Sequence, residues 1–319
     1  MQIAMKQFVK KCILFCLLFI SSYILFFLIN RGIVGNQYEG SFSAAMLDKY
    51  DRMQSIRQPK IILVGNSNVS FGFDSEMLEQ AFDMPVVNMG YNGNLGNENC
   101  ERTVLFGINK GDIVIVCDDS YTGSYILDPV SAWRAIEYHT KLWRVISKDQ
   151  YIRMAEAYPY YAVVAAFYKL KGSPYNKIDN TTVYSRGAYN LYGDVVDRVP
   201  TKLDKSTFQN VGIPTINQDG AEWLRNLNEY VQNSGATLLI AGYPIGDGEY
   251  RTWSDEELDN FKEQIESSTG CDVISDYKDY LFPYSYFYNQ FLHLSKKGAK
   301  ARTEQLIRDL GRWLDEKDK

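Results

Sequence analysis

The sequence predicts an α/β fold in which a mainly parallel sheet carries helices on both faces. The composition, 45% hydrophobic and 23% charged over 319 residues, is that of a globular protein with enough apolar material for a core. Short apolar runs alternate with segments of helical periodicity, which is the pattern of β–α–β units. The alternation stops over residues 120–216 and then resumes, which indicates one domain with an insertion.

The first expected strand, "KIILVG" at 60–65, precedes a helix at 74–82 with Asp74 or Ser75 as its N-cap. Further strands are expected at 84–90, 111–119, 236–244 and 271–275. Further helices are expected at 97–108, at 217–232 and from 295 onward. In the last two helices apolar residues recur at helical spacing, which indicates a face packed against the sheet. These elements predict a flavodoxin-like three-layer α/β/α domain over residues 59–319.

The insertion has a helical, aromatic-rich part at 130–171 and a loop-rich part at 172–209. Open α/β sheets bind their ligands at the carboxyl ends of the strands. We therefore expect the insertion to cover that edge of the sheet. The aromatic clusters at 158–168 and 281–291 favour core packing and docking of the insertion, with stacking on sugars as the alternative.

Residues 1–35 predict a transmembrane anchor. No charge occurs between Cys12 and Asn30, and a helix needs roughly 17–25 apolar residues to cross a bilayer. Most of the flanking basic residues precede this run: Lys6, Lys10 and Lys11. The positive-inside rule then places the N-terminus in the cytoplasm and the main domain outside. A cleaved signal peptide is the alternative, but the run exceeds an apolar region of about 7–15 residues and lacks an A-x-A-like site. A polar membrane-proximal segment is expected at 36–58.

Charge and rare residues limit the function classes. The net charge is −5, and residues 1–37 hold four basic residues and no acid, so the remainder has 30 bases, 39 acids and a net charge of −9. An acidic outer domain argues against nucleic acid as a partner. The chain has two histidines, which excludes a His-rich metal site, and three cysteines beyond the anchor, which leave at most one disulfide. We expect neither a metal nor another cofactor.

Ser67 follows the first strand in "IILVGNSNVSFGFD", at the expected ligand-binding edge. A serine hydroxyl needs a nearby base to act as a nucleophile. The two candidate bases are His293, just before the last helix, and His139, in the insertion, where a surface or packing role is more natural. The alternative for Ser67 is a turn serine that satisfies backbone groups.

Three short blocks resemble those of the SGNH/GDSL hydrolase superfamily. "ILVGNSNVSFGFD" resembles the first block, in which a strand ends in Gly-Asp-Ser, and "VVNMGYNGNLG" resembles the second. "HLSKKGAKA" resembles the last block, in which a histidine precedes the C-terminal helix. The blocks occur in the family's order over about residues 59–120 and 215–315. The chain is most similar to membrane-anchored extracytoplasmic bacterial members, some of which work with membrane-bound O-acyltransferases.

The resemblance implies Ser67 as nucleophile, His293 as general base, and an oxyanion hole from the N–H groups of Ser67 and Gly90. An asparagine side chain normally completes that hole, but no Gly-x-Asn-Asp block follows the third expected strand. Asn92 or Asn94, in the second block, is our substitute. Loss of one such donor costs roughly 10²–10³ in rate.

A second departure concerns the carboxylate that normally lies three residues before the histidine. Gln290 holds that position and Asn289 stands beside it, while the nearest upstream acids are Asp276 and Asp279. An amide oxygen can orient an imidazole, as in some Cys-His sites, but it cannot stabilise the imidazolium as a carboxylate does.

Other polar residues near the first strand have supporting roles in this interpretation. Asn66 replaces the family's aspartate and is expected to hold the turn. Asp118 and Asp119 end the third strand and are expected at the same edge.

These observations predict an anchored, outward-facing serine esterase or acyl-transferring enzyme. Its expected substrate is an acylated cell-surface glycan or polymer, and a membrane-bound O-acyltransferase is its candidate partner. The alternative is a weak or inactive SGNH-like domain that binds a glycan or such a partner. The missing aspartate and third-block asparagine favour that alternative.

Overall fold

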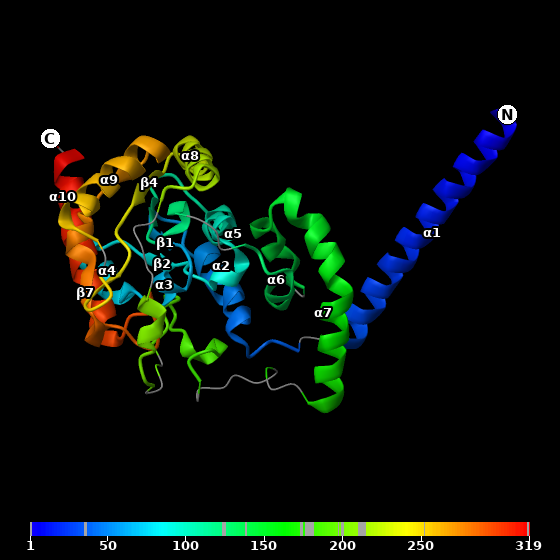
Figure 1. The fold of residues 1–319 in the computed structure, drawn as a ribbon, viewed down its shortest axis with the longest axis horizontal. Helices are drawn as coiled ribbons and strands as arrows, with labels where there is room; N and C mark the ends of the chain where they lie inside the picture. The colour runs from blue at the N-terminus through cyan, green and yellow to red at the C-terminus, as the bar shows by residue number, and fades with distance from the viewer. Residues whose placement is uncertain are drawn as a thin grey trace.

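The computed structural model describes residues 2–34, 37–122, 126–137, 139–172, 175, 182–196, 198, 201–209, 215–251, 253–317 and 319 (Figure 1). Parts of the expected insertion lie outside the described residues, namely 123–125, 138, 173–174, 176–181, 197, 199–200 and 210–214. Residues 35–36, where the expected anchor meets the membrane-proximal segment, also lie outside them.

A five-stranded sheet forms the centre of the domain, and every neighbouring pair of its strands is parallel. The strand order is β2-β1-β3-β4-β6. Its strands are β1 Ile61–Val64, β2 Val86–Asn88, β3 Ile113–Val116, β4 Thr237–Ile240 and β6 Asp272–Val273. A separate parallel pair joins β5 Ile245–Asp247 to β7 Leu281–Pro283. The prediction of a mixed α/β fold with a mainly parallel sheet is confirmed.

Both faces of the sheet are buried, which explains why its central strands β1 and β3 are uniformly apolar. Successive side chains of a strand point to opposite faces. Ile62 and Val64 belong to one hydrophobic cluster, whereas Ile61 and Leu63 belong to another. A strand covered on both sides needs apolar residues at every position, as β1 and β3 have.

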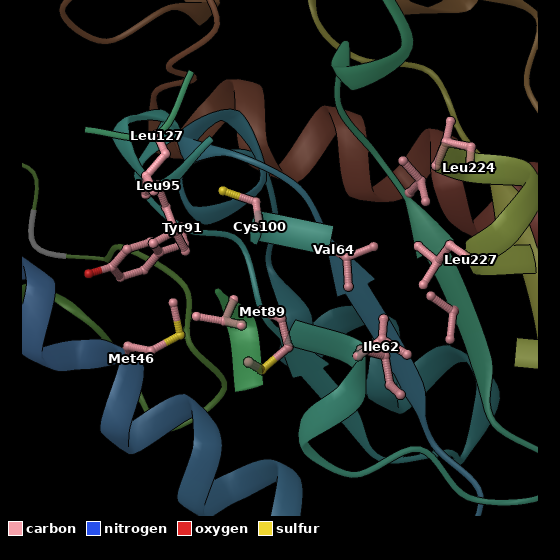
Figure 2. Close-up of a cluster of buried hydrophobic side chains, with 14 of the residues drawn as sticks. Met46, Ile62, Val64, Met89, Tyr91, Leu95, Cys100, Leu127, Leu224 and Leu227 are labelled. Atoms are coloured by element: carbon pink, nitrogen blue, oxygen red, sulfur yellow. The ribbon is translucent and has the colours of Figure 1, made fainter. Parts of the chain in front are cut away.

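Helices before and after the strands cover these faces (Figure 1). They are α2 Ala45–Ser55, α4 Ser75–Phe82, α5 Asn97–Glu101, α8 Gln218–Asn233, α9 Asp255–Thr269 and α10 Lys296–Lys317. α2, α5 and α8 contribute side chains to the cluster that contains Ile62, while α4 and α10 contribute to the cluster that contains Ile61. Figure 2 shows the first cluster, with Leu224 and Leu227 of α8 facing the sheet.

One detail of the predicted elements is wrong. The helix expected at 97–108 is α-helical only to Glu101 and continues as a 3₁₀ helix, Arg102–Phe106. The segment expected at 36–58 contains α2, which buries Met46 and Met53 in the core of the domain.

The two parts of the insertion go to different places. The helical part forms α6 Pro129–Ile136 and α7 Tyr151–Lys171, which pack together beside the end of α1 Gln2–Val34 (Figure 1). The loop-rich part reaches the carboxyl ends of the strands, where the Val195 N–H donates to the Ser70 carbonyl at 2.9 Å. The Asp204 N–H likewise donates to the Asn289 carbonyl at 2.9 Å.

One helix among the described residues is long and apolar enough to cross a membrane, by length and composition. It spans Met5–Gly32 within α1, and no residue of its most apolar window is buried in the structure. Figure 1 shows α1 projecting away from the rest of the molecule.

Candidate active site

A sharp turn after β1 places Ser67 at the carboxyl edge of the sheet. Gly65 adopts a φ of +144°, and a Cβ there would lie 2.7 Å from Val69 Cγ2 and 2.8 Å from Asp118 Cγ. Only glycine fits this conformation and this space. The chain then enters the short helix α3, Ser67–Ser70, so Ser67 is its first residue and its side chain is half-buried.

The asparagines around Ser67 fix the turn. Asn66 caps α3, and its Oδ1 accepts hydrogen bonds from the backbone N–H and the side-chain amide of Asn68, each at 3.0 Å. Its Nδ2 donates to Asp119 Oδ1 at 2.9 Å, and its backbone N–H donates to Asp118 Oδ2 at 2.8 Å. The ends of β1 and β3 are thus tied together directly beneath Ser67.

Ser67 and His293, 226 positions apart in the chain, are in hydrogen-bond contact. Ser67 Oγ lies 2.9 Å from His293 Nε2, and His293 Nδ1 lies 2.9 Å from Asn289 Oδ1. Asn289 Nδ2 in turn donates to the Tyr184 hydroxyl at 2.7 Å, which directs the amide oxygen toward the imidazole. Nδ1 therefore carries the proton, and Nε2 is the acceptor for the Ser67 hydroxyl.

The structure distinguishes the candidates for the third position. Asn289, four residues before the histidine, contacts Nδ1, whereas Gln290 Nε2 lies 3.4 Å from Nε2 on the opposite side of the ring. Asp276 caps the backbone of Lys278, and Asp279 accepts a hydrogen bond from Gln305. The two acids therefore have partners of their own.

The backbone and an aromatic ring hold His293 in place. Leu292, directly before it, has a φ of +70°, a left-handed conformation that is uncommon for a non-glycine residue. Phe71 stacks on the imidazole with ring centroids 4.2 Å apart and ring planes 6° apart. Backbone strain beside a buried functional group is typical of active sites.

The surroundings of His293 favour its neutral form. Only 3% of the surface of His293 is exposed to solvent. Burial, and secondarily the Arg198 guanidinium, lowers the pKa of His293 from 6.5 to about 4. Arg198 belongs to the insertion, and its Nη2 donates to the Phe71 carbonyl at 2.8 Å. At neutral pH the imidazole is therefore available as a proton acceptor, although a weak one.

Arg302 of α10 is a supporting residue that the sequence did not indicate. Its guanidinium is fully buried and donates to the Asn68 carbonyl at 3.1 Å and to Asn68 Oδ1 at 3.0 Å. It also donates to the Cys117 carbonyl at 2.5 Å and the Gly242 carbonyl at 3.0 Å. One side chain thus joins the ends of β1, β3 and β4.

A cavity of about 310 Å³ opens in front of the Ser67 hydroxyl. Its described lining residues are Asn66, Ser67, Asn92, Gly93, Asn94, Thr207, Gln290, Phe291, Leu292 and His293. No lysine, arginine, aspartate or glutamate occurs among them. Thr207 comes from the insertion, and its Oγ1 accepts a hydrogen bond from the Phe291 N–H at 2.8 Å. The cavity therefore suits an uncharged group rich in hydrogen-bonding atoms.

Two of the three expected oxyanion donors remain open. The Ser67 N–H and Asn92 Nδ2 make no hydrogen bond within the part of the chain that the structure describes, and Asn92 Oδ1 is fixed by the Asn94 N–H at 3.0 Å. Gly90 differs, because its N–H donates to Asn88 Oδ1 at 2.8 Å and it does not line the cavity. In this structure the Gly90 N–H is therefore not available as the oxyanion donor that the resemblance implies.

Asn92→Ala is expected to lower the rate of ester hydrolysis about 10²-fold, because it removes one donor to the developing oxyanion. Asn94→Ala is the matched control, since the Asn94 side chain lines the same cavity but is exposed. The two variants would be compared by kcat, with KM expected to change little. Equal effects at both positions would contradict the assignment of Asn92.

The arrangement provides a nucleophile, a neutral base, an orienting amide and open hydrogen-bond donors at one cavity, which is the requirement for acyl transfer through a covalent serine intermediate. Among the described residues, no group of three His, Cys, Asp or Glu side chains could hold a metal ion. His139 lies in the insertion at the N-cap position of a 3₁₀ helix, Thr140–Val145, where its side chain makes no capping hydrogen bond. No protein-family model, no curated protein and no solved structure matches this chain.

Proposed function

We propose that the protein is a serine esterase or acyl-transferring enzyme of the SGNH type. The observation that carries this proposal is the chain of contacts from Ser67 Oγ through His293 to Asn289 at the mouth of an uncharged cavity. A turn serine would need none of these partners. The strand order, and a core on both faces of the sheet, support a flavodoxin-like three-layer arrangement.

The mechanism follows from the direction of the hydrogen bonds. Ser67 Oγ attacks the carbonyl carbon of an acyl ester while its proton passes to His293 Nε2. The Ser67 N–H and Asn92 Nδ2 stabilise the oxyanion. The intermediate expels the alcohol oxygen, which takes the proton from His293. Water or an acceptor hydroxyl then attacks the acyl-serine carbonyl while its proton passes to His293 Nε2. The second tetrahedral intermediate expels Ser67 Oγ, which takes that proton back from His293.

The proposed substrate is an acylated glycan or polymer at the cell surface. An amide-lined, uncharged cavity can bind hydroxyl-rich groups through hydrogen bonds. The Met5–Gly32 helix supports a single-pass membrane protein, and the basic residues before it support a cytoplasmic N-terminus with the main domain outside. A membrane-bound O-acyltransferase is the proposed partner.

One observation favours a second candidate, a binding module with little turnover. Asn289 is neutral, and the pKa of His293 is lowered to about 4, so the imidazolium formed during attack is poorly stabilised. A domain that only holds an acylated glycan or a partner would tolerate this weakness.

Covalent labelling of the intact protein with a fluorophosphonate separates the two candidates. The reagent reacts with serines activated by a base, so the esterase proposal expects one label at Ser67, mapped by mass spectrometry. Ser295 is the internal control. Its hydroxyl donates to the Tyr286 carbonyl rather than to a histidine, so it should not be labelled.

The outcomes are distinct. Stoichiometric labelling of Ser67 supports the enzyme. Absence of labelling in a protein that still unfolds cooperatively supports the binding module. Labelling of several serines to similar extents contradicts activation at this site.

A further inference from the structure

The outward face of α7 is strongly apolar. Ile152, Tyr160, Val163, Phe167 and Leu170 are 71%, 66%, 65%, 51% and 88% exposed, respectively. They recur at helical spacing and share one side of the helix. The sequence from 157 to 168 contains no charged residue. Glu156, which is also exposed, lies on the same side between Ile152 and Tyr160, so the uninterrupted apolar patch consists of Tyr160, Val163, Phe167 and Leu170. An exposed apolar patch of this kind marks an interaction surface.

The other face of α7 is already used. It buries the side chains of Met154, Tyr158, Tyr161, Ala162 and Ala165. Trp133 of α6 packs on Tyr158, with ring centroids 4.7 Å apart. A helix that is apolar on both sides is either enclosed by protein or in contact with lipid, and the outward face of α7 is not enclosed.

A backbone carbonyl left without its helical partner by a proline links α7 to the candidate membrane helix α1. Pro159 lacks the N–H that would bond the Ala155 carbonyl inside the helix. The Tyr23 hydroxyl of α1 donates to that carbonyl instead. Membrane proteins satisfy backbone groups freed by proline in this way, through a neighbouring helix, because lipid offers no hydrogen bonds.

The contacts between α1 and α7 involve residues within the uncharged run of α1, not residues that follow it. Phe27 packs on Tyr158 with ring centroids 4.8 Å apart, and Asn30 Nδ2 contacts the Tyr158 hydroxyl at 3.4 Å. The uncharged run extends from Cys12 to Asn30, so Tyr23 lies about 10 Å inside its end at roughly 1.5 Å per residue. Figure 1 shows α7 beside this end of α1.

We propose that the outward face of α7 lies in the interfacial layer of the phospholipid bilayer that α1 spans. Tyr160 and Phe167 suit that layer, where aromatic rings concentrate. Lys171 is exposed at the end of α7, where its Nζ lies 4.5 Å from the centroid of the Phe167 ring, and its ammonium can contact the headgroups. Two membrane contacts, instead of one flexible anchor, limit the orientations of the domain and hence of the Ser67 cavity. The inference depends on the proposed anchoring by α1, but not on catalysis.

Spin-label accessibility in lipid vesicles tests this proposal. The full-length chain would carry Cys12→Ala and Cys16→Ala, since the other three cysteines are buried. A nitroxide would be attached in turn at Val163→Cys on α7, Phe19→Cys on α1 and Glu263→Cys on α9. The vesicles would contain phosphatidylcholine and phosphatidylglycerol. Collisions with oxygen, which concentrates in lipid, would be compared with collisions with a water-soluble nickel complex.

The proposal expects severalfold higher oxygen-to-nickel ratios at Val163→Cys and Phe19→Cys than at Glu263→Cys. A lipid ratio at Phe19→Cys with a water ratio at Val163→Cys would leave the anchor standing and overturn the α7 contact. A water ratio at both positions would overturn the anchor as well. Low access to both reagents at Val163→Cys would show a protein surface covering α7, which also overturns the proposal.

Discussion

Ser67→Ala is expected to abolish hydrolysis of a short-chain acyl ester, with a fall in kcat of at least about 10³-fold, because it removes the hydroxyl that forms the acyl-enzyme in the proposed mechanism. The fold should persist. The Ser67 side chain is half-buried at a cavity, and His293, its hydrogen-bond partner among the described residues, keeps its contact with Asn289. Ester hydrolysis and the midpoint of urea unfolding would be measured on the same preparation.

Ser70→Ala is the matched control on the same short helix. The Ser70 hydroxyl is fully buried and donates to the Gly90 carbonyl at 2.6 Å, so its loss should reduce the free energy of unfolding by roughly 1 kcal/mol or more. Activity should remain. The two serines thus have opposite expected effects on activity and stability. Full activity in Ser67→Ala would remove the nucleophile assignment, and the polar turn would then be structural only.

The sheet was predictable because its central strands β1 and β3 are apolar at every position, a pattern that few other elements share. Helix α9, in contrast, was not predicted from the sequence. Ser254 and Glu257 form a capping box that begins it, a signal visible in the sequence but not used in the prediction. α2 was underestimated because its residues are mostly polar by type, and only the fold shows that Met46 and Met53 enter the core.

The two central residues of the site were predictable from the short motifs around them, while their partners depended on loop geometry. The resemblance placed Gln290 at the position of the carboxylate, with Asn289 beside it, and left the choice between them open. In the structure Leu292 is left-handed, and Asn289 is the residue that contacts Nδ1. Arg302 could not be inferred, because its acceptors are backbone carbonyls at the ends of separate strands, which sequence does not bring together.

Asn289→Asp is expected to raise the pKa of His293 by about 1–3 units, since an opposite charge within about 4–6 Å stabilises the imidazolium. The partner geometry permits the change. The Tyr184 hydroxyl, which now accepts from Asn289 Nδ2, can turn and donate to the new carboxylate. The shift would appear in the acid limb of fluorophosphonate inactivation, measured as the second-order rate constant against pH. This readout needs no knowledge of the natural substrate.

The sign of the effect follows from the pKa of His293. In the natural protein burial lowers that pKa to about 4, so the base stays neutral, and inactivation should persist until the pH falls toward that value. In Asn289→Asp the acid limb should lie at a higher pH. Above that pH the inactivation rate constant should increase, because a stronger base accepts the Ser67 proton. Gln290→Asp is the comparison, because a carboxylate beside Nε2 should also raise the pKa of His293 but would compete with Ser67 for Nε2, so the rate above the acid limb should not increase.

Stability should respond to acid in the corresponding way. A histidine whose folded pKa lies below its unfolded value of 6.5 takes up a proton more readily when unfolded, so His293 destabilises the fold as pH falls from about 6.5 toward 4. Asn289→Asp narrows the difference between the two pKa values and should reduce this loss between neutral pH and pH 5. An acid limb that does not move, together with an unchanged acid sensitivity of unfolding, would show that His293 is not the base or that Asn289 does not orient it.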